Sequence, residues 1–446
     1  MNTPIIDFVK KYAESGIVRA HMPGHKGTDF VGGEKYDITE VDGADVLYRG
    51  KGIITQSQAN ATALFGSAKT VYSCEGSSLS IRAMVYLAML YARQNGRVGK
   101  ILACRNAHRS FMTACALVDV DVEWMYSDKN NGIIACEITP ESLENKLAKS
   151  PVLPAAFYVT SPDYLGNIAD VKGLAEVCHR YGIMLLVDNA HGSYLNFLPD
   201  SQHPMSLGAD MCCDSAHKTL PVLTGGAYLH IGKNAPEILS DNAERAMMLF
   251  ASTSPSYLIL QSLDNANLYI YNGYRERLNG FCAKIDSLKK RLCDKGYELL
   301  GNEPLKLSIA PKSYGYTGEN LADILHKSNI ECEYSDRDYT VMMLTPEISD
   351  DELKHIEKTL CGIEKKEAID ENIPALPKPE KAKEIRDAMM SPSRECDVSC
   401  SIGKTIADAV ISCPPAIPVI VAGEIVDEQT VACLEYYGIE KCNIVY

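Results

Sequence analysis

Short apolar runs alternate with amphipathic segments along the middle of the chain, between about residues 70 and 235. The apolar runs have the length of buried strands, and several of the segments between them have helical spacing. Strands are predicted at residues 69–73, 101–105, 120–126, 155–160, 184–189, 210–216 and 226–231, and helices at 78–94, 110–116 and 171–181. This alternation predicts an α/β fold with a mostly parallel seven-stranded sheet flanked by helices.

The segments outside this pattern predict further domains. Residues 1–69 are expected to form an irregular N-terminal arm with a helix near 55–64, and residues 70–300 a large domain that ends in helices. Smaller α+β C-terminal domains follow: a small domain at 301–365, an exposed linker rich in Lys, Glu and Pro at 366–383, and a module at 384–446.

The composition narrows the class of protein. The 446 residues carry a net charge of −14, which argues against nucleic-acid binding and is compatible with a cationic small-molecule substrate. The chain shows no secretory signal and no apolar run long enough for a membrane span, so a cytoplasmic protein with no membrane partner is expected. Its 16 cysteines are scattered. They predict reduced thiols, with neither disulfides nor a structural metal site.

Ligands of such sheets bind at the carboxyl ends of the strands, so the residues after each apolar run are the candidates for function. Glu75-Gly76-Ser77-Ser78 follows the first run and opens a helix, which predicts either an anion site or an ordinary serine N-cap. His108 follows the second run and could stack on an aromatic ligand or lie solvated in a loop. Thr160-Ser161-Pro162-Asp163 follows the fourth run and has the composition of a turn.

Two further strand ends carry a carboxylate and a lysine. Asp188 ends the fifth run, where burial is costly unless a cation meets it or the carboxylate caps a turn. Lys218 follows the sixth run in Ser215-Ala216-His217-Lys218 and is read as closing a buried strand. Desolvation would favour its neutral, nucleophilic form; the alternative is a surface lysine. An amine, a carboxylate, a stacking ring and an anion site together match the needs of pyridoxal 5'-phosphate (PLP).

These residues also belong to longer motifs that resemble one family, the bacterial ornithine/lysine/arginine decarboxylases, which are PLP enzymes of fold type I. The matching stretches are His21-Met-Pro-Gly-His-Lys-Gly27, Asp37-Ile-Thr-Glu40, Gly76-Ser77-Ser78, Arg105-Asn-Ala-His108-Arg-Ser110, Asp188-Asn-Ala-His191-Gly192, Ser215-Ala-His-Lys-Thr-Leu-Pro221, Thr253-Ser-Pro-Ser-Tyr257 and Pro414-Pro-Ala-Ile-Pro418. The chain resembles the short forms, which lack an N-terminal wing domain. It differs from many relatives by having Asn189 where they have glutamate.

The resemblance implies a role for each matching residue. The large domain would bind PLP, with Lys218 as the Schiff-base lysine, Asp188 on the pyridinium nitrogen and His108 stacked on the ring. The phosphate would be held by Gly76, Ser77, Ser78, Ser215 and His217, with Ala190 under the ring and His191 near its edge. Ser252 and Thr253 would reach the phosphate of a neighbouring subunit, which implies a homodimer or higher homo-oligomer with shared active sites.

The implied reaction is decarboxylation of a basic L-amino acid, with arginine expected first and lysine or ornithine next. Catalysis would rest on Lys218, His108, Asp188 and His191, and the products would be CO₂ and an amine such as agmatine, cadaverine or putrescine. Asp45, Glu40 and Asp163 are candidates for binding the distal cation on composition alone. Two alternatives stay open: another fold type I reaction, such as transamination or side-chain lysis, and a catalytically silent PLP-binding regulator.

Overall fold

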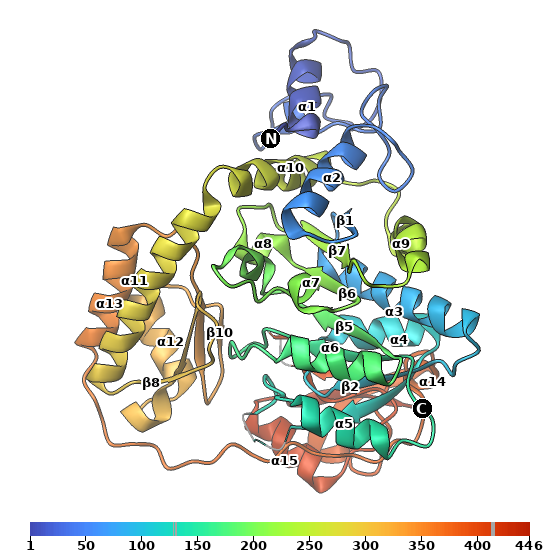
Figure 1. Cartoon of the computed structure of the whole chain (residues 1–446). Coiled ribbons are helices and arrows are strands. Elements are labelled where there is room, and N and C mark those ends of the chain that lie inside the picture. The colour runs from blue at the N-terminus through green and yellow to red at the C-terminus, as the bar shows by residue number, and fades with distance from the viewer. Residues whose placement is uncertain (128, 130–131, 412–414) are drawn as a thin grey trace. The chain divides into compact units, whose positions relative to one another are not determined.

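The computed structural model, drawn in Figure 1, describes residues 1–127, 129, 132–411 and 415–446. These residues form two compact units. The first unit consists of Met1–Arg97 and Val171–Arg277, and the second of Val98–Asp170 and Leu278–Tyr446. Among the described residues, no helix combines the length and the apolar character that crossing a bilayer requires. Within the motif Pro414–Pro418, the first residue lies outside the described part of the chain.

The seven predicted strands are confirmed, with ends that differ from the prediction by at most two residues. They are β1 (Lys69–Ser73), β2 (Lys100–Cys104), β3 (Asp121–Met125), β4 (Ala156–Thr160), β5 (Met184–Asp188), β6 (Met211–Asp214) and β7 (Ala227–Ile231). They form one sheet in the order β1-β7-β6-β5-β4-β2-β3. β7 runs antiparallel to both of its neighbours, while β5 and β6 pair in parallel, as do β2 and β3. The sheet is therefore mostly parallel, as predicted.

One strand end is not where the apolar pattern places it. The prediction that a strand continues to Ala216 is wrong, because β6 ends at Asp214 and Ala216–Thr219 form the single-turn helix α8. The antiparallel partner explains the difference: Asp214 pairs with Tyr228, and β7 begins one residue earlier, at Ala227. Beyond Asp214 the backbone has no strand left to pair with and turns. Lys218 therefore lies in this turn and does not close a strand.

Helices of the first unit cover its strands and hold the arm in place. They are α1 (Pro4–Glu14), α2 (Ile53–Phe65), α3 (Gly76–Gln94), α6 (Val171–Arg180), α7 (Pro204–Leu207), α9 (Glu237–Phe250) and α10 (Tyr257–Tyr271), with 3-10 turns at Glu34–Tyr36 and Ser193–Phe197. In α3, Leu79, Ala83 and Leu87 are fully buried at helical spacing, and the helix packs against β7 and α9. The sequence did not predict α1, whose first turn donates two backbone N–H groups to Asp264 of α10, at 2.9 and 3.1 Å.

In the second unit, β2, β3 and β4 are accompanied by α4 (Arg109–Val118) and α5 (Pro140–Ala148). The small domain has an antiparallel sheet ordered β10-β11-β9-β8 together with two helices, an α+β arrangement. Its elements are β8 (Glu298–Leu300), β9 (Lys306–Ala310), β10 (Tyr334–Ser335), β11 (Thr340–Met343), the turn Pro311–Tyr314, α12 (Gly318–Lys327) and α13 (Asp350–Gly362). The helix α11 (Tyr274–Lys295) precedes them along the chain.

The C-terminal module consists of short elements around a small apolar core. It contains α14 (Ile385–Met389), β12 (Ser393–Asp397), the turn Val398–Cys400, β13 (Val410–Ile411), β14 (Pro418–Ile420), α15 (Glu428–Tyr436) and β15 (Lys441–Val445). β12 pairs with β15, and β13 with β14, each antiparallel. A buried ion pair at 3.2 Å joins Glu424 of this module to Arg105, the residue that follows β2. The two partners are each about 4–5% exposed, so water contributes little to their solvation.

Candidate functional site

The carboxyl ends of β5 and β6 bring a lysine and a histidine together within the first unit. Lys218 Nζ lies 2.8 Å from Nε2 of His191, and the backbone N–H of Ser215 donates to the carbonyl of Ala190 at 3.3 Å. The parallel pairing of β5 with β6 makes both strands end at the same edge, so the turns that follow them meet. An amine held by an imidazole is suited to exchanging a proton with it.

Asp188, the last residue of β5, supplies a buried carboxylate next to this pair in sequence. Asp188 is 2% exposed. Oδ1 accepts from the backbone N–H of Ala190 at 3.2 Å and from the thiol of Cys213 at 3.4 Å. Both are weak or neutral donors, and a buried carboxylate gains most from a charged donor such as a pyridinium N–H.

The N-terminus of α3 faces hydroxyl groups from two elements. Ser215 Oγ lies 2.8 Å from Ser77 Oγ, and Gly76 adopts a φ of +68°, which favours glycine. Glu75, at the N-cap, makes no side-chain capping hydrogen bond among the described residues; its carboxylate instead accepts the backbone N–H of Ser252 at 2.7 Å. The start of a long helix, next to two hydroxyls, favours the binding of an anion.

The three other predicted phosphate ligands are His217, Ser252 and Thr253. The ring and backbone nitrogens of His217 both lie within hydrogen-bond distance of the carbonyl of Gly226, with the ring Nδ1 at 2.9 Å. Because a carbonyl can only accept, Nδ1 carries a proton, and His217 would donate from Nε2 only when protonated. Ser252 and Thr253 are exposed after α9. Their role at a neighbouring subunit stays a prediction.

His108 belongs to the second unit and is the N-cap of α4. Its Nδ1 accepts from the backbone N–H of Ser110 at 3.1 Å and lies 2.9 Å from the Ser110 hydroxyl. In the neutral ring the proton is therefore on Nε2. The cap fixes the ring at the end of β2, and its stacking role stays a prediction.

Two of the three carboxylates predicted as candidates for binding the substrate's distal cation already accept hydrogen bonds from backbone N–H groups. Asp45 Oδ2 accepts from the N–H groups of Gly52 and Ile54 at 2.9 and 3.0 Å, at the start of α2. Asp163 accepts from the backbone and side-chain nitrogens of Asn167, at 2.9 and 2.8 Å. Glu40 is exposed, and no contact is recorded for its carboxylate among the described hydrogen bonds and ion pairs. These contacts favour structural roles for Asp45 and Asp163.

The burial of Asp163 predicts a measurable pH dependence of stability. Burial raises the pKa of Asp163 to about 6, above the value of about 3.9 in an unfolded chain. Between these values the native state binds more protons than the unfolded state, so the free energy of unfolding falls as pH rises through this window. We expect Asp163→Asn to remove this dependence of the free energy of unfolding on pH. The difference in that free energy between variant and wild type should therefore change by up to about 3 kcal/mol between pH 4 and pH 7. Urea unfolding across that range measures the difference, and parallel curves for the two proteins would contradict it.

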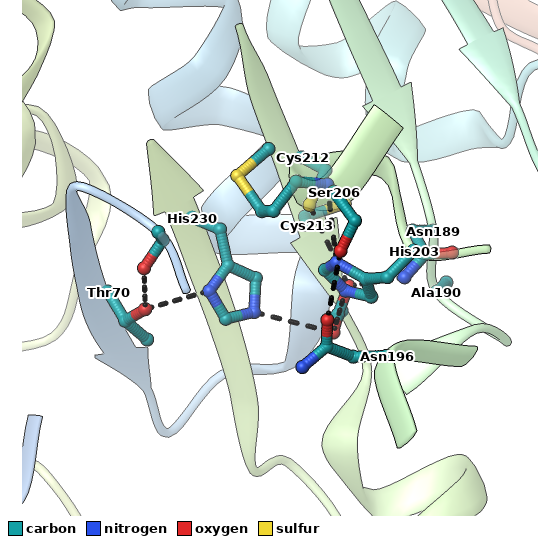
Figure 2. Close-up of polar contacts among 12 residues, drawn as sticks. Thr70, Asn189, Ala190, Asn196, His203, Ser206, Cys212, Cys213 and His230 are labelled. Atoms are coloured by element: carbon teal, nitrogen blue, oxygen red, sulfur yellow. Dashed lines mark hydrogen bonds and ion pairs between the residues drawn. The ribbon is translucent and has the colours of Figure 1, made fainter. Parts of the chain in front are cut away.

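Sequence reasoning missed a cluster of three ionisable residues beneath the site. His203, Asp214 and His230 are fully buried in the first unit. Figure 2 labels the two histidines. A signal was present, because Asp214 and His230 both interrupt apolar runs that were predicted to be buried strands, and buried ionisable groups require partners. His203, in a polar segment next to Pro204, gave no such signal.

The residues at the β5 and β6 ends fit the chemical needs of PLP: an amine, a buried carboxylate and hydroxyls at a helix N-terminus. Solved structures share the fold. The lysine decarboxylase LdcF of Francisella novicida aligns over 100% of this chain and 81% of its own, with a TM-score of 0.80 and 17% identity. The constitutive lysine decarboxylase of E. coli aligns over 100% and 82%, with a TM-score of 0.78 and 16% identity. The fold is thus that of fold type I decarboxylases.

Sequence comparison identifies the family. The model of the Orn/Lys/Arg decarboxylase major domain matches residues 3–301. An arginine decarboxylase of Bacillus subtilis is 31% identical, over 96% of this chain and 92% of its own. An arginine decarboxylase of Halalkalibacterium halodurans is 28% identical, over 96% and 92%. The chain belongs to the ornithine/lysine/arginine decarboxylase family and is a decarboxylase, and this membership implies PLP as cofactor.

Proposed function

We propose that this enzyme decarboxylates L-arginine to agmatine and CO₂, with PLP bound at Lys218. The observation that carries the proposal is the 2.8 Å contact between Lys218 Nζ and His191 Nε2, next to the turn that follows Asp188. Arginine is favoured over lysine and ornithine because the similar curated proteins of B. subtilis and H. halodurans are arginine decarboxylases.

Each residue has a distinct task in this proposal. PLP, when bound, supplies the electron sink that stabilises the carbanion left by loss of CO₂. The carboxylate of Asp188 keeps a proton on the pyridine nitrogen, and the hydroxyls of Ser77 and Ser215 hold the phosphate at the start of α3. His108 and Ala190 would contact the PLP ring, as the family resemblance implies.

Proton transfer at Cα falls to the lysine and the histidine beside it. After CO₂ leaves, Cα needs a proton, and Nζ of Lys218 or Nε2 of His191 can deliver it. Through the same hydrogen bond, Nε2 of His191 can accept a proton from the Lys218 ammonium, which leaves the amine neutral and nucleophilic. We further propose a homodimer, in which Ser252 and Thr253 reach the partner's phosphate site. We also propose that Glu40, whose carboxylate is exposed, binds the distal cation of the substrate.

Product analysis tests the proposed substrate and reaction together. We expect the holoenzyme to convert L-arginine to agmatine with release of one CO₂, and to act at least about tenfold more slowly on L-lysine and L-ornithine, a difference of roughly 1.4 kcal/mol. Mass spectrometry identifies the amine and a coupled assay measures CO₂. A keto acid as product would show that the enzyme transaminates and does not decarboxylate. Cadaverine or putrescine as the main product would overturn the choice of arginine.

A further inference from the structure

A fully buried carboxylate lies directly below the strand ends that carry the candidate site. Asp214 Oδ2 lies 3.0 Å from His203 Nε2 and 3.3 Å from His230 Nε2. On its other side His230 contacts the hydroxyl of Thr70 through Nδ1, at 2.8 Å (Figure 2). Burial alone would raise the pKa of Asp214, but the two histidines outweigh it and hold that pKa well below its usual range. The carboxylate is therefore ionised and accepts hydrogen bonds only.

The three side chains have the spacing of metal ligands, but their hydrogen bonds are those of a proton-bonded network. Their ligand atoms lie within 4.8 Å of one another. However, the backbone N–H of Met205 donates to His203 Nδ1 at 3.3 Å, so this nitrogen bears a lone pair. Nε2 of the neutral ring then carries the proton and donates it to Asp214. A metal at Nε2 would need the opposite tautomer, which would set two N–H groups against each other at Nδ1.

The second oxygen of Asp214 connects this network to the candidate site. Asp214 Oδ1 accepts from Asn189 Nδ2 at 2.7 Å, and Asn189 is the residue between Asp188 and the Ala190-His191 turn. Because a carboxylate cannot donate, the amide of Asn189 must present its nitrogen. Gly192 leaves room for this arrangement, since a Cβ there would lie 2.0 Å from Asn189 Oδ1. Nδ2 of Asn189 is thus held by Asp214, while its Oδ1 is buried beside Gly192 with no hydrogen-bond partner among the described residues.

We propose that Asp214 and Asn189 are positioning residues, a buried acceptor and donor whose hydrogen bond fixes the Asp188–His191 turn against β6 and so orients Asp188 and His191 toward PLP. The part that concerns PLP rests on the proposed function. Asp188 and His191 flank Asn189 by one and two residues, so a shift of the Asn189 side chain moves both. Asp214 in turn directly precedes Ser215 and the turn that holds Lys218.

Because Asn189 donates and Asp214 accepts, exchanging the two residue types between the two positions is the sharpest test. Asn189→Asp alone would set two carboxylates against each other in a buried site, and Asp214→Asn alone would remove the ionic acceptor. The double variant Asn189→Asp with Asp214→Asn restores one donor and one acceptor, and its amide oxygen can still accept from His203. We therefore expect the double variant to recover much of what either single variant loses, which is coupling beyond additivity. The same pairing of donor and acceptor accounts for asparagine at position 189 in a chain with aspartate at 214.

A matched control lies at the other end of the same strand pair. Asp210 precedes β6, its Oδ2 accepts from the backbone N–H of Leu185 at 2.8 Å, and it pairs with His179 at 3.0 Å. Asp210→Asn therefore also removes a carboxylate that joins β5 to β6 and contacts a histidine, but at the end away from the site. Asn189→Ala, which removes the donor without adding a charge, is the milder variant if Asn189→Asp does not fold.

Hydrogen exchange of the apo protein measures positioning without PLP, and PLP titration measures its effect on the cofactor. We expect Asn189→Asp, Asp214→Asn and Asn189→Ala to speed exchange of the amides at residues 189–192 and to weaken PLP binding by about 10- to 100-fold. The double exchange should return both toward wild type, and Asp210→Asn should change neither by more than about threefold.

Three results would overturn the proposal. The first is that the losses of the two single variants add up in the double variant, and the second is that Asp210→Asn has effects as large as those of Asp214→Asn. The third is a stoichiometric metal ion in the wild type that Asp214→Asn loses. A wild-type protein that binds no PLP would instead overturn the proposed function, while the exchange data would still decide whether the pair fixes the turn.

Discussion

Lys218→Ala is expected to reduce the rate of decarboxylation by on the order of 10³-fold or more, the largest effect of any single change in this chain. The variant lacks the amine that would hold PLP covalently and the Nζ that contacts His191 at 2.8 Å. Borohydride reduction of wild type should fix PLP on the peptide that contains Lys218, and peptide mass spectrometry should find no such adduct in the variant. The rate and the adduct report separately on catalysis and on attachment.

Lys233→Ala is the control for this experiment. Lys233 is an exposed lysine of the same unit, two residues after β7 ends at Ile231. It should keep the wild-type rate and the wild-type adduct. If Lys218→Ala decarboxylates at nearly the wild-type rate, or if the adduct forms on another lysine, the assignment of Lys218 is wrong.

Glu424→Gln is expected to lower the free energy of unfolding by about 3–5 kcal/mol. The change removes one charge of a buried pair and leaves the Arg105 guanidinium without its counter-ion. Arg105 also donates to the carbonyls of Pro418 and Val419, at 3.2 and 2.9 Å, so the same side chain holds β14 to the end of β2. Trp124, the single tryptophan of the chain, lies 5.3 Å from the guanidinium carbon, and its fluorescence follows unfolding at this place.

An exposed ion pair nearby provides the comparison. Arg109 and Asp408 lie 3.3 Å apart with side chains 47% and 33% exposed, and they too link the region after β2 to the C-terminal module. Asp408→Asn should cost less than about 1 kcal/mol, because water solvates whichever charge remains. Equal losses for the two variants would mean that the burial of the Arg105–Glu424 pair does not determine its contribution.

The apolar pattern predicted the strands because most of them are buried along nearly their whole length, and buried strands are rich in apolar residues; β3, only partly buried, is the exception. It failed at the end of β6, where the partner strand β7 and not the local sequence decides where pairing stops. Composition also suggested Asp45 and Asp163 as substrate ligands. Their carboxylates bind backbone N–H groups several residues away, contacts that depend on how the loops close and leave no trace in composition.

The candidate site likewise has residues that the sequence predicts and contacts that it does not. Lys218, Asp188, Ser77 and Ser215 were found because strand ends of a parallel sheet are predictable, and motif resemblance added their roles. The contact of Lys218 with His191 and the network of Asp214 could not be predicted, because they join residues 11 to 27 positions apart through side-chain geometry. His203 shows the limit clearly: only the folded chain brings it to Asp214.

The hydrogen bond between Asn189 and Asp214 restricts how this sequence can change over generations. A mutation that makes position 189 acidic is unfavourable while position 214 is acidic, and an amide at 214 removes the charged acceptor of the Asn189 amide. Descendants of this chain would therefore reach the opposite arrangement through a poorly tolerated intermediate, or through both changes together. Among relatives, the two positions should vary as a correlated pair, with one acid and one amide in each lineage.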